Sequence, residues 1–195
     1  MFKTHVLAGV ALLACATAAF AGPPLSRDEA IKLLSRPGSW LEADGALLPD
    51  GSISAKDLEV YAPGDTAETE DAAIYGAVQN LNRAKSSMRV LGYAVTWDVN
   101  TTIKDDQKRK VLSSKIEEGL GVKVQGIVQS DGSFKATKIR IVSMKNKDGK
   151  LKAKEKLFGP CTVVDPKRGV LRIINTTVTL REDAAFVMHT TVPGQ

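Results

Sequence analysis

The feature that most constrains the fold is a stretch that occurs twice, at a constant offset of 81 residues. Residues 45–60 return as residues 126–141 without a gap. The identities are Gly45, Asp50, Gly51, Ser52 and Ala55, which recur as Gly126, Asp131, Gly132, Ser133 and Ala136. A gap-free repeat of this kind indicates an internal duplication of one structural unit.

Each copy carries an Asp-Gly pair between two apolar-rich runs. Such a pair is a strong hairpin signal, because a type I′ turn needs positive φ at both central residues, and Asp and Gly tolerate it. We therefore predict structural turns at Asp50-Gly51 and Asp131-Gly132.

The strand that follows each turn changes the parity of its apolar alternation at the same place. The change falls between Ala55 and Leu58 in one copy and between Ala136 and Ile139 in the other. A change of parity that keeps one face buried indicates a β-bulge, and bulges help a small sheet to curl into a barrel.

A second repeated unit relates residues 74–103 to residues 157–186 at an offset of 83. The alternation in each copy breaks near Gly92 or Asn175, residue types that adopt left-handed conformations readily. We therefore expect two further hairpins, each with a bent second strand. Along the chain the order is second half, first half, second half, first half.

Three kinds of motif support a family resemblance: L-F-G-P-C-T-V-V-D from Leu157, V-K-V-Q-G from Val122, and D-G-S-F-K-A-T-K-I from Asp131. They resemble the bacterial secreted domain-of-unknown-function family 5666. The resemblance covers residues 74–144 as one complete unit, flanked by half units at 38–61 and 157–188. It implies small OB-like β-barrels and supplies no catalytic residues that match positions here.

The expected fold class is all-β: two small OB-like β-barrel units from an internal duplication, with a short N-terminal helix. A lone two-stranded hairpin is marginal in water, so residues 38–61 and 157–188 should complete a second barrel together. Pairing within one chain is favoured over a swapped dimer or a head-to-tail assembly, because it avoids the entropy lost on association. We expect a monomer.

The remaining segments have distinct compositions. Residues 1–21 have the charged start, apolar run and A-x-A site of a signal peptide, with cleavage between Ala21 and Gly22. Lipidation at Cys15 is the less favoured alternative. Residues 22–37 should contain a helix with Ser26 and Glu29 as a capping box. Residues 62–73 form an acidic linker, residues 145–156 a lysine-rich linker, and residues 189–195 a polar tail.

The lysine-rich linker is the one candidate partner-binding segment, through Lys145, Lys147, Lys150, Lys152, Lys154 and Lys156. Nucleic acid is disfavoured as its partner, because proteins that bind single strands pair a basic groove with aromatic platforms and aromatics are only 5% of this chain. Another envelope protein or an anionic envelope surface fits an exported chain better. We expect no transmembrane span after signal cleavage.

No residue set predicts catalysis, a cofactor or a metal site. Cys161 stands where the repeat has Val78, which favours a buried small side chain over a reactive thiol. Met88, Met144, Met188 and His189 are possible copper(I) ligands, but their spacing follows no motif. Neither Ser52 nor Ser133 has a histidine partner, so turn chemistry accounts for both.

The sequence therefore favours an exported, non-enzymatic binding or structural module of the bacterial cell envelope. The alternative is a periplasmic protein that binds a metal or a small anion.

Overall fold

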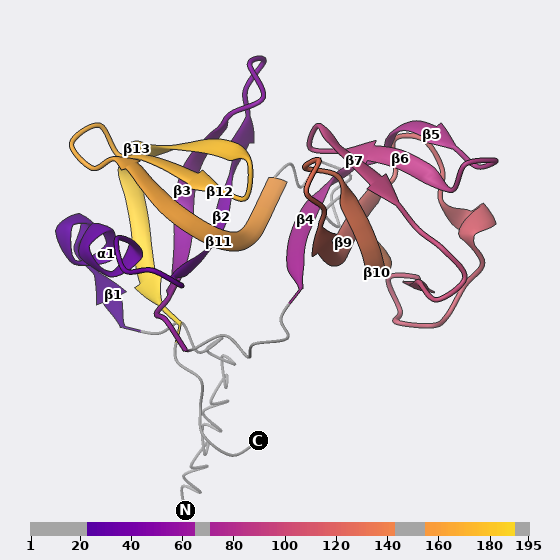
Figure 1. Cartoon of the computed structure of the whole chain (residues 1–195), viewed down its shortest axis with the longest axis horizontal. Helices are drawn as coiled ribbons and strands as arrows, with labels where there is room; N and C mark the ends of the chain where they lie inside the picture. The colour runs from indigo at the N-terminus through magenta and orange to yellow at the C-terminus, as the bar shows by residue number, and fades with distance from the viewer. Residues whose placement is uncertain (1–22, 65–70, 143–154, 190–195) are drawn as a thin grey trace, which may run out of the picture.

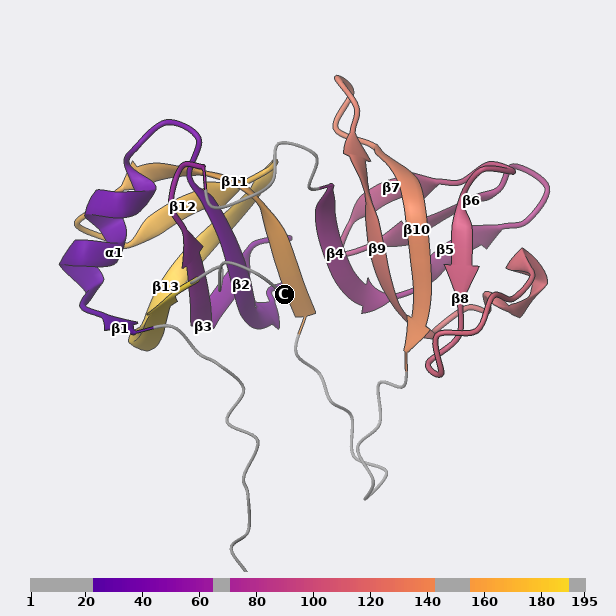
Figure 2. The same ribbon diagram turned by 90° about the horizontal axis from the view of Figure 1, so that it is seen from below.

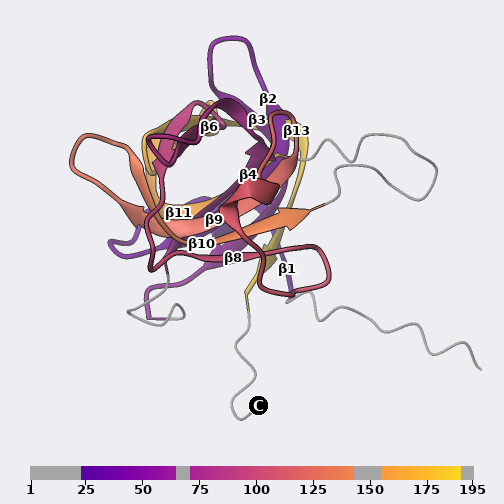
Figure 3. The same cartoon turned by 90° about the vertical axis from the view of Figure 1, so that its right-hand side faces the viewer.

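The computed structural model describes residues 23–64, 71–142 and 155–189, and they form two β-barrels that lie side by side (Figure 1). The fold is all-β, as expected from the sequence, with a closed five-stranded barrel and a single α-helix in the described part of the chain. Viewed end-on, the strands wrap round a central core (Figure 3). Among the described residues, none of the helices is long and apolar enough to cross a membrane.

The first barrel combines strands from both ends of the chain. Its strand order is β13-β3-β2-β11-β12, and it closes because β12 pairs with β13. All its pairs are antiparallel except β13 with β3. The strands are β2 (Trp40–Leu47), β3 (Ile53–Tyr61), β11 (Glu155–Asp165), β12 (Val170–Ile173) and β13 (Thr176–Met188).

The second barrel is continuous in sequence. Its strand order is β4-β9-β10-β7-β6-β5, and it closes because β5 follows β4 after only Val78. A short 3-10 helix, η1 (Ser113–Lys115), lies between β8 and β9. The strands are β4 (Ala72–Ala77), β5 (Gln79–Asn82), β6 (Ser87–Val90), β7 (Tyr93–Thr96), β8 (Thr102–Lys104), β9 (Gly121–Val128) and β10 (Phe134–Val142).

The two barrels share one register. Ile53 pairs with Val178 in the first barrel, and Phe134 pairs with Val95 in the second. The offsets of 81 and 83 residues convert one pair into the other, and they do the same for Leu58 with Phe186 and Ile139 with Ile103. The sequence repeat thus corresponds to a repeat of strand pairing, while the duplication event itself stays a prediction.

The β-bulges occur where the apolar alternation placed them. The register shifts between Asp44 and Gly45 opposite Lys56, and between Ala136 and Lys138 in the second barrel. A Cβ on Gly45 would collide with the carbonyl oxygen of Ser54, and one on Gly126 with that of Lys135. Glycine recurs at these two positions because neighbouring backbone occupies the space that a side chain would need.

The Asp-Gly hairpins are present, but the predicted type I′ geometry is wrong. Positive φ occurs at Gly51 (82°) and Gly132 (81°) and not at the aspartates before them. The amide of Gly51 donates to the carbonyl of Leu48, and that of Gly132 to Gln129. Each turn is therefore a three-residue loop with a left-handed glycine at its end. Each aspartate carboxylate instead accepts the amide of the serine two residues on, at 2.9 Å.

The prediction of a single bent strand near Gly92 and another near Asn175 is also wrong. Each is two strands joined by a two-residue turn, with Val90 paired to Tyr93 and Ile173 paired to Thr176. Leu91 and Gly92 both have positive φ, as a type I′ turn requires. The type I′ geometry therefore occurs at Leu91-Gly92 and not at the two Asp-Gly pairs.

The N-terminal helix forms as predicted. Helix α1 (Arg27–Leu34) has the capping box, with the Ser26 amide donating to Glu29 at 2.9 Å and the Glu29 amide donating to Ser26 at 3.3 Å. The helix packs on the first barrel through its buried residues Ala30 and Leu34. A short strand that the sequence did not predict, β1 (Pro24–Leu25), precedes it and pairs with β13.

The barrels are joined by an antiparallel pairing of β11 with β4, which lie next to each other between the barrels in Figure 2. Both linkers are shorter than expected, because β4 begins at Ala72 and β11 at Glu155. The segment predicted to be a signal peptide, the acidic residues 65–70 and five of the six linker lysines, Lys145, Lys147, Lys150, Lys152 and Lys154, lie outside the described residues.

Candidate functional site

The β11–β4 junction makes one continuous sheet of six strands, in the order β3-β2-β11-β4-β9-β10. Side chains alternate between its two faces. One face supplies the barrel cores through a row of residues that are at most 2% exposed: Leu58, Ala43, Leu157, Ile74, Val124 and Ile139. The residues before and after each of these point to the opposite side, away from both cores.

We call this opposite side the outer face and define it by two rows of paired residues. The first row, from β3 to β10, is Glu59, Glu42, Phe158, Ala73, Gln125 and Lys138. The second row is Asp57, Asp44, Lys156, Tyr75, Lys123 and Arg140.

Charge divides the outer face between the barrels. The β2 and β3 half carries four carboxylates, and the β9 and β10 half carries three cations and an amide. The division follows the repeat position by position, at the offset of 81 residues. Glu42, Asp44, Asp57 and Glu59 of the first barrel correspond to Lys123, Gln125, Lys138 and Arg140 of the second.

Like charges lie directly opposite each other within each half. Glu42 is paired with Glu59 and Asp44 with Asp57, while Lys123 is paired with Arg140. Such cross-strand pairs are destabilising. The sheet therefore brings like charges together within each half, where opposite charges from a neighbour are favourable.

Lys156 offsets part of the repulsion on the acidic half. Its ammonium lies 2.7 Å from Glu42 and 3.0 Å from Asp44. Burial opposes the charge on Lys156, but the hydrogen bonds to these two carboxylates outweigh burial, and the pKa of the lysine is raised above its ordinary value. Lys156 is thus a strand residue in an ion-pair cluster, and the prediction that it belongs to a solvated linker is wrong.

The basic half has fewer neutralising contacts. The Arg140 guanidinium donates to the backbone carbonyl of Asp106 at 3.1 Å. Lys123 and Lys138 are exposed, and within residues 23–64, 71–142 and 155–189 neither has an ion-pair partner.

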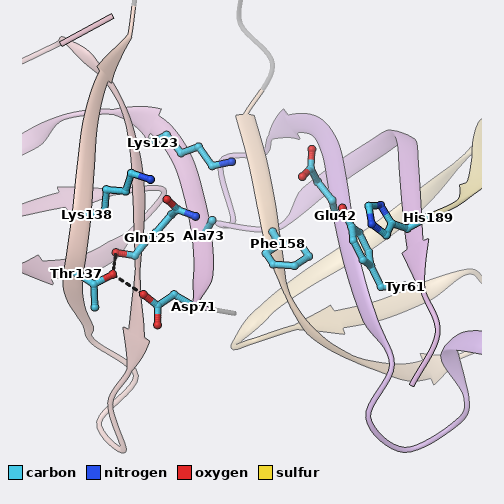
Figure 4. Close-up of a pocket in the computed structure, with 10 residues that line it drawn as sticks. All are labelled: Glu42, Tyr61, Asp71, Ala73, Lys123, Gln125, Thr137, Lys138, Phe158 and His189. Carbon is cyan, nitrogen blue, oxygen red and sulfur yellow. Dashed lines mark hydrogen bonds between the residues drawn. The ribbon is translucent and has the colours of Figure 1, made fainter. Parts of the chain in front are cut away.

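A groove of about 440 Å³ runs along the middle of the outer face (Figure 4). Phe158 lies at its centre, with the aromatic rings of Tyr61 and His189 on the first-barrel side and Lys123 and Lys138 on the other. The groove thus has one aromatic wall and one basic wall.

The aromatic wall is a packed cluster. The Phe158 ring lies 5.0 Å from that of Trp40 and 5.1 Å from that of Tyr61, and Tyr61 stacks on His189 at 4.2 Å. The Nδ1 atom of His189 lies 2.7 Å from the Glu59 carboxylate. His189 therefore lines the groove, whereas the sequence placed it at the start of the polar tail, residues 189–195.

The β-bulge of the second barrel contributes to the lining of the groove beside Lys123 and Lys138. Its extra residue, Thr137, donates to the Asp71 carboxylate, and its hydroxyl also lies 3.2 Å from the Gln125 carbonyl (Figure 4). The first of these contacts holds Asp71, which directly follows the acidic residues 65–70, against the second barrel.

The predicted structural turns meet at a second cavity, of about 480 Å³, which is lined by Gly51 and by Asp131-Gly132. Beside them the Tyr93 hydroxyl lies 2.7 Å from that of Thr176, which links the two barrels. Burial raises the pKa of Tyr93, so the phenol stays neutral at ordinary pH.

The other candidate residues do not come together. Cys161 is buried and free, and burial raises its pKa to about 12, so its thiol is unreactive at neutral pH. Met88 is in the core of the second barrel, whereas Met188 and His189 end the first barrel, and Met144 is outside the described residues. In the described ranges, no group of three or more His, Cys, Asp or Glu side chains is arranged to hold a metal ion.

The comparisons with known proteins fit this geometry. Residues 75–140 match the family model described as a domain of unknown function (DUF5666). The resemblance inferred from the sequence is thereby confirmed for the central unit. The match covers about a third of the chain and falls within the second barrel. No curated protein and no solved structure matches the chain.

Sequence reasoning missed the outer face although its signal is present. Comparing residues at the offset of 81 shows acid exchanged for base at Glu42 and Lys123, at Asp57 and Lys138, and at Glu59 and Arg140. The sequence does not show that these residues share one face of a sheet, and the strand pairing does.

Proposed function

We propose that the protein is an exported, non-enzymatic binding or structural module of the bacterial cell envelope, and that it holds its partner on the outer face. The observation that carries the proposal is the division of one sheet face into a half with paired carboxylates and a half with paired cations. Electrostatic complementarity confers specificity and speeds association, so a divided charge pattern suits recognition.

The groove strengthens this proposal. Aromatic residues concentrate at protein interfaces because they bury a large area at a low entropic cost. Here Tyr61 and Phe158 lie beside Lys123 and Lys138, so a partner would contact apolar and charged groups together. An envelope protein with a matching charge pattern fits both walls better than a uniformly anionic surface does.

Capture from envelope extract tests the proposal. Mature wild-type protein on beads should retain a defined set of proteins, and Lys123→Glu/Lys138→Glu should lose them. The matched control is Lys85→Glu/Lys115→Glu, which makes the same change in net charge at exposed positions off the outer face. Equal capture by all three proteins would rule out the outer face as the binding surface.

Export is a separate part of the proposal and has its own test. The signal-peptide pattern of residues 1–21 supports it. Protein released by osmotic shock should have an intact mass that begins at Gly22 without an acyl group. A lipid-modified Cys15 terminus would instead make the protein membrane-anchored.

A second candidate function is small-anion binding, which is favoured by Lys123 and Lys138 lining one groove wall with Gln125. Calorimetric titration with phosphate distinguishes it, since heat that disappears in Lys123→Glu/Lys138→Glu would support it. Titration with copper(I) and zinc in the same series tests the metal alternative.

A further inference from the structure

The outer face has a pseudo-twofold axis between β11 and β4. Applying the offsets of 81 and 83 residues to the first row and reversing its direction gives the second row. Under this operation Phe158 becomes Tyr75, Ala73 becomes Lys156, and Glu42 becomes Lys123. The positions of the face are thus exchanged in pairs by the operation, and at three of the pairs a carboxylate is exchanged for a cation.

A face with this property is complementary to itself. A twofold interface requires that residue i of one copy meets residue j of the other and that j meets i. If a second copy is rotated by 180° about an axis that lies in the interface and runs parallel to β11 and β4, each row faces the same row of the other copy. The two rows then run in opposite directions. The acidic half of one copy then covers the basic half of the other.

We propose that the partner of the outer face is a second copy of this chain, docked face to face about that axis. This inference rests on the proposed function, in that it uses the same surface. The first row then places Glu59 opposite Lys138, Glu42 opposite Gln125, and the large Phe158 opposite the small Ala73. The second row places Asp57 opposite Arg140, Asp44 opposite Lys123, and Lys156 opposite Tyr75.

Charge selects this arrangement over its alternative. Rotation about the in-plane axis perpendicular to β11 and β4 would place Glu42 against Asp44, Asp57 against Glu59, and Lys138 against Arg140. Like-charge contacts across an interface are strongly unfavourable. At the centre of the favoured arrangement, the Lys156 ammonium faces the ring of Tyr75, where a cation–π contact is favourable.

The expectation of a monomer was based only on the entropy of association. It took no account of a surface on which three carboxylates and three cations face opposite charges in another copy, with Glu42 facing the amide of Gln125. In the dimer, each like-charged pair gains opposite charges across the interface, which offsets the repulsion that the isolated chain retains.

Sedimentation equilibrium of the mature protein tests the proposal. At about 0.05 M salt the wild type should form a dimer that dissociates on dilution, and the association constant should fall roughly tenfold or more at about 0.5 M salt. A wild type that stays monomeric at every concentration would overturn the proposal. Growth beyond the dimer would exclude closed twofold docking, and a salt-insensitive dimer would indicate strand exchange instead.

Two charge-inverted variants make the test specific. Lys138→Glu/Arg140→Glu and Asp57→Arg/Glu59→Lys should each be monomeric, because both remove the opposite pairs Glu59 with Lys138 and Asp57 with Arg140. Mixed one to one, they should form a heterodimer. Thermal melting of each variant checks that it is folded, and dimers in either variant alone, or no heterodimer from two folded variants, would contradict the docking.

The outcome also separates this inference from the proposed function. If the wild type is monomeric and Lys123→Glu/Lys138→Glu still loses its envelope partners, the outer face binds a different protein. If the wild type dimerises as described and capture from extract is unaffected, the face is used for self-association alone.

Discussion

The two barrels share their strand pairing, their bulges and their Asp-Gly turns, yet they carry opposite charges on corresponding parts of one sheet face. Most core positions are exchanged for other apolar residues, such as Ile53 for Phe134 and Val78 for Cys161, and the core residue Tyr93 corresponds to Thr176. Outer-face positions are exchanged for residues of opposite charge, such as Glu42 for Lys123. The comparison separates the residues that specify the barrel from those that specify what it contacts.

The largest expected effect comes from truncating the equivalent core residues. Phe134→Ala should destabilise the second barrel by about 4 kcal/mol, and Ile53→Ala the first by about 3 kcal/mol, through lost burial and the cavity left behind. Both side chains are 0% exposed, and Phe134 additionally packs on Tyr93 at 5.7 Å between ring centroids.

Hydrogen exchange of the two variants shows whether the barrels are independent. We expect each variant to lose protection mainly in its own barrel, since only the β11–β4 pairing and nearby contacts join them. Equal loss of protection in both barrels would show that they unfold as a single unit.

The bulge glycines provide the next test. Gly45→Ala and Gly126→Ala should each cost about 2 kcal/mol, because the added methyl meets the carbonyl oxygen of Ser54 or Lys135, which is fixed backbone. Urea unfolding midpoints measure this loss of stability. Lys56→Ala, at the exposed bulge residue of the first barrel, is the control and should change the midpoint little. A marked difference between the two glycines would mean that the bulges are not equivalent.

The hairpin glycines should differ slightly between the barrels. Gly51→Val and Gly132→Val should each cost about 1 kcal/mol or more, because valine is strained at positive φ. An added Cβ at Gly51 has free space, whereas one at Gly132 would lie 2.8 Å from the side-chain nitrogen of Asn175. Gly132→Val should therefore be the worse of the two, and Asn175→Ala in the same chain should remove the difference. Denaturant midpoints that show full tolerance of valine would contradict the turn assignment.

The smallest effect concerns pH. The pKa values of Asp50 and Asp131 are lowered below the ordinary value of 3.8, chiefly by hydrogen bonds from the serines two residues later. A lowered pKa contributes stability above the unfolded-state pKa that is lost as pH falls through the folded value. Asp50→Asn/Asp131→Asn should thus make the protein slightly less sensitive to acid below about pH 4. Melting temperatures at neutral and acid pH measure this, and an unchanged acid response would mean that these carboxylates do not contribute.

The sequence alone determined the repeat, the positions of the bulges and the N-terminal cap. Each of these depends on residues close together in the chain: the change of parity after Ala55 and Ala136, and the spacing of Ser26 and Glu29. Local backbone preferences act over a few residues, so local pattern is sufficient evidence for them. The hairpin turn types were wrong because loop length decides between them, and loop length depends on where the strands stop pairing.

The tertiary structure alone decided how the two ends of the chain form one barrel, how the barrels join through β11 and β4, and how the outer face is divided. Lys156 illustrates the reason. In the sequence it is the last of six linker lysines, but the pairing of β11 with β2 places it between Glu42 and Asp44, more than a hundred residues away in the chain. Charges that lie apart in sequence act together only when strand register brings them into one row, and no local preference of the chain specifies that register.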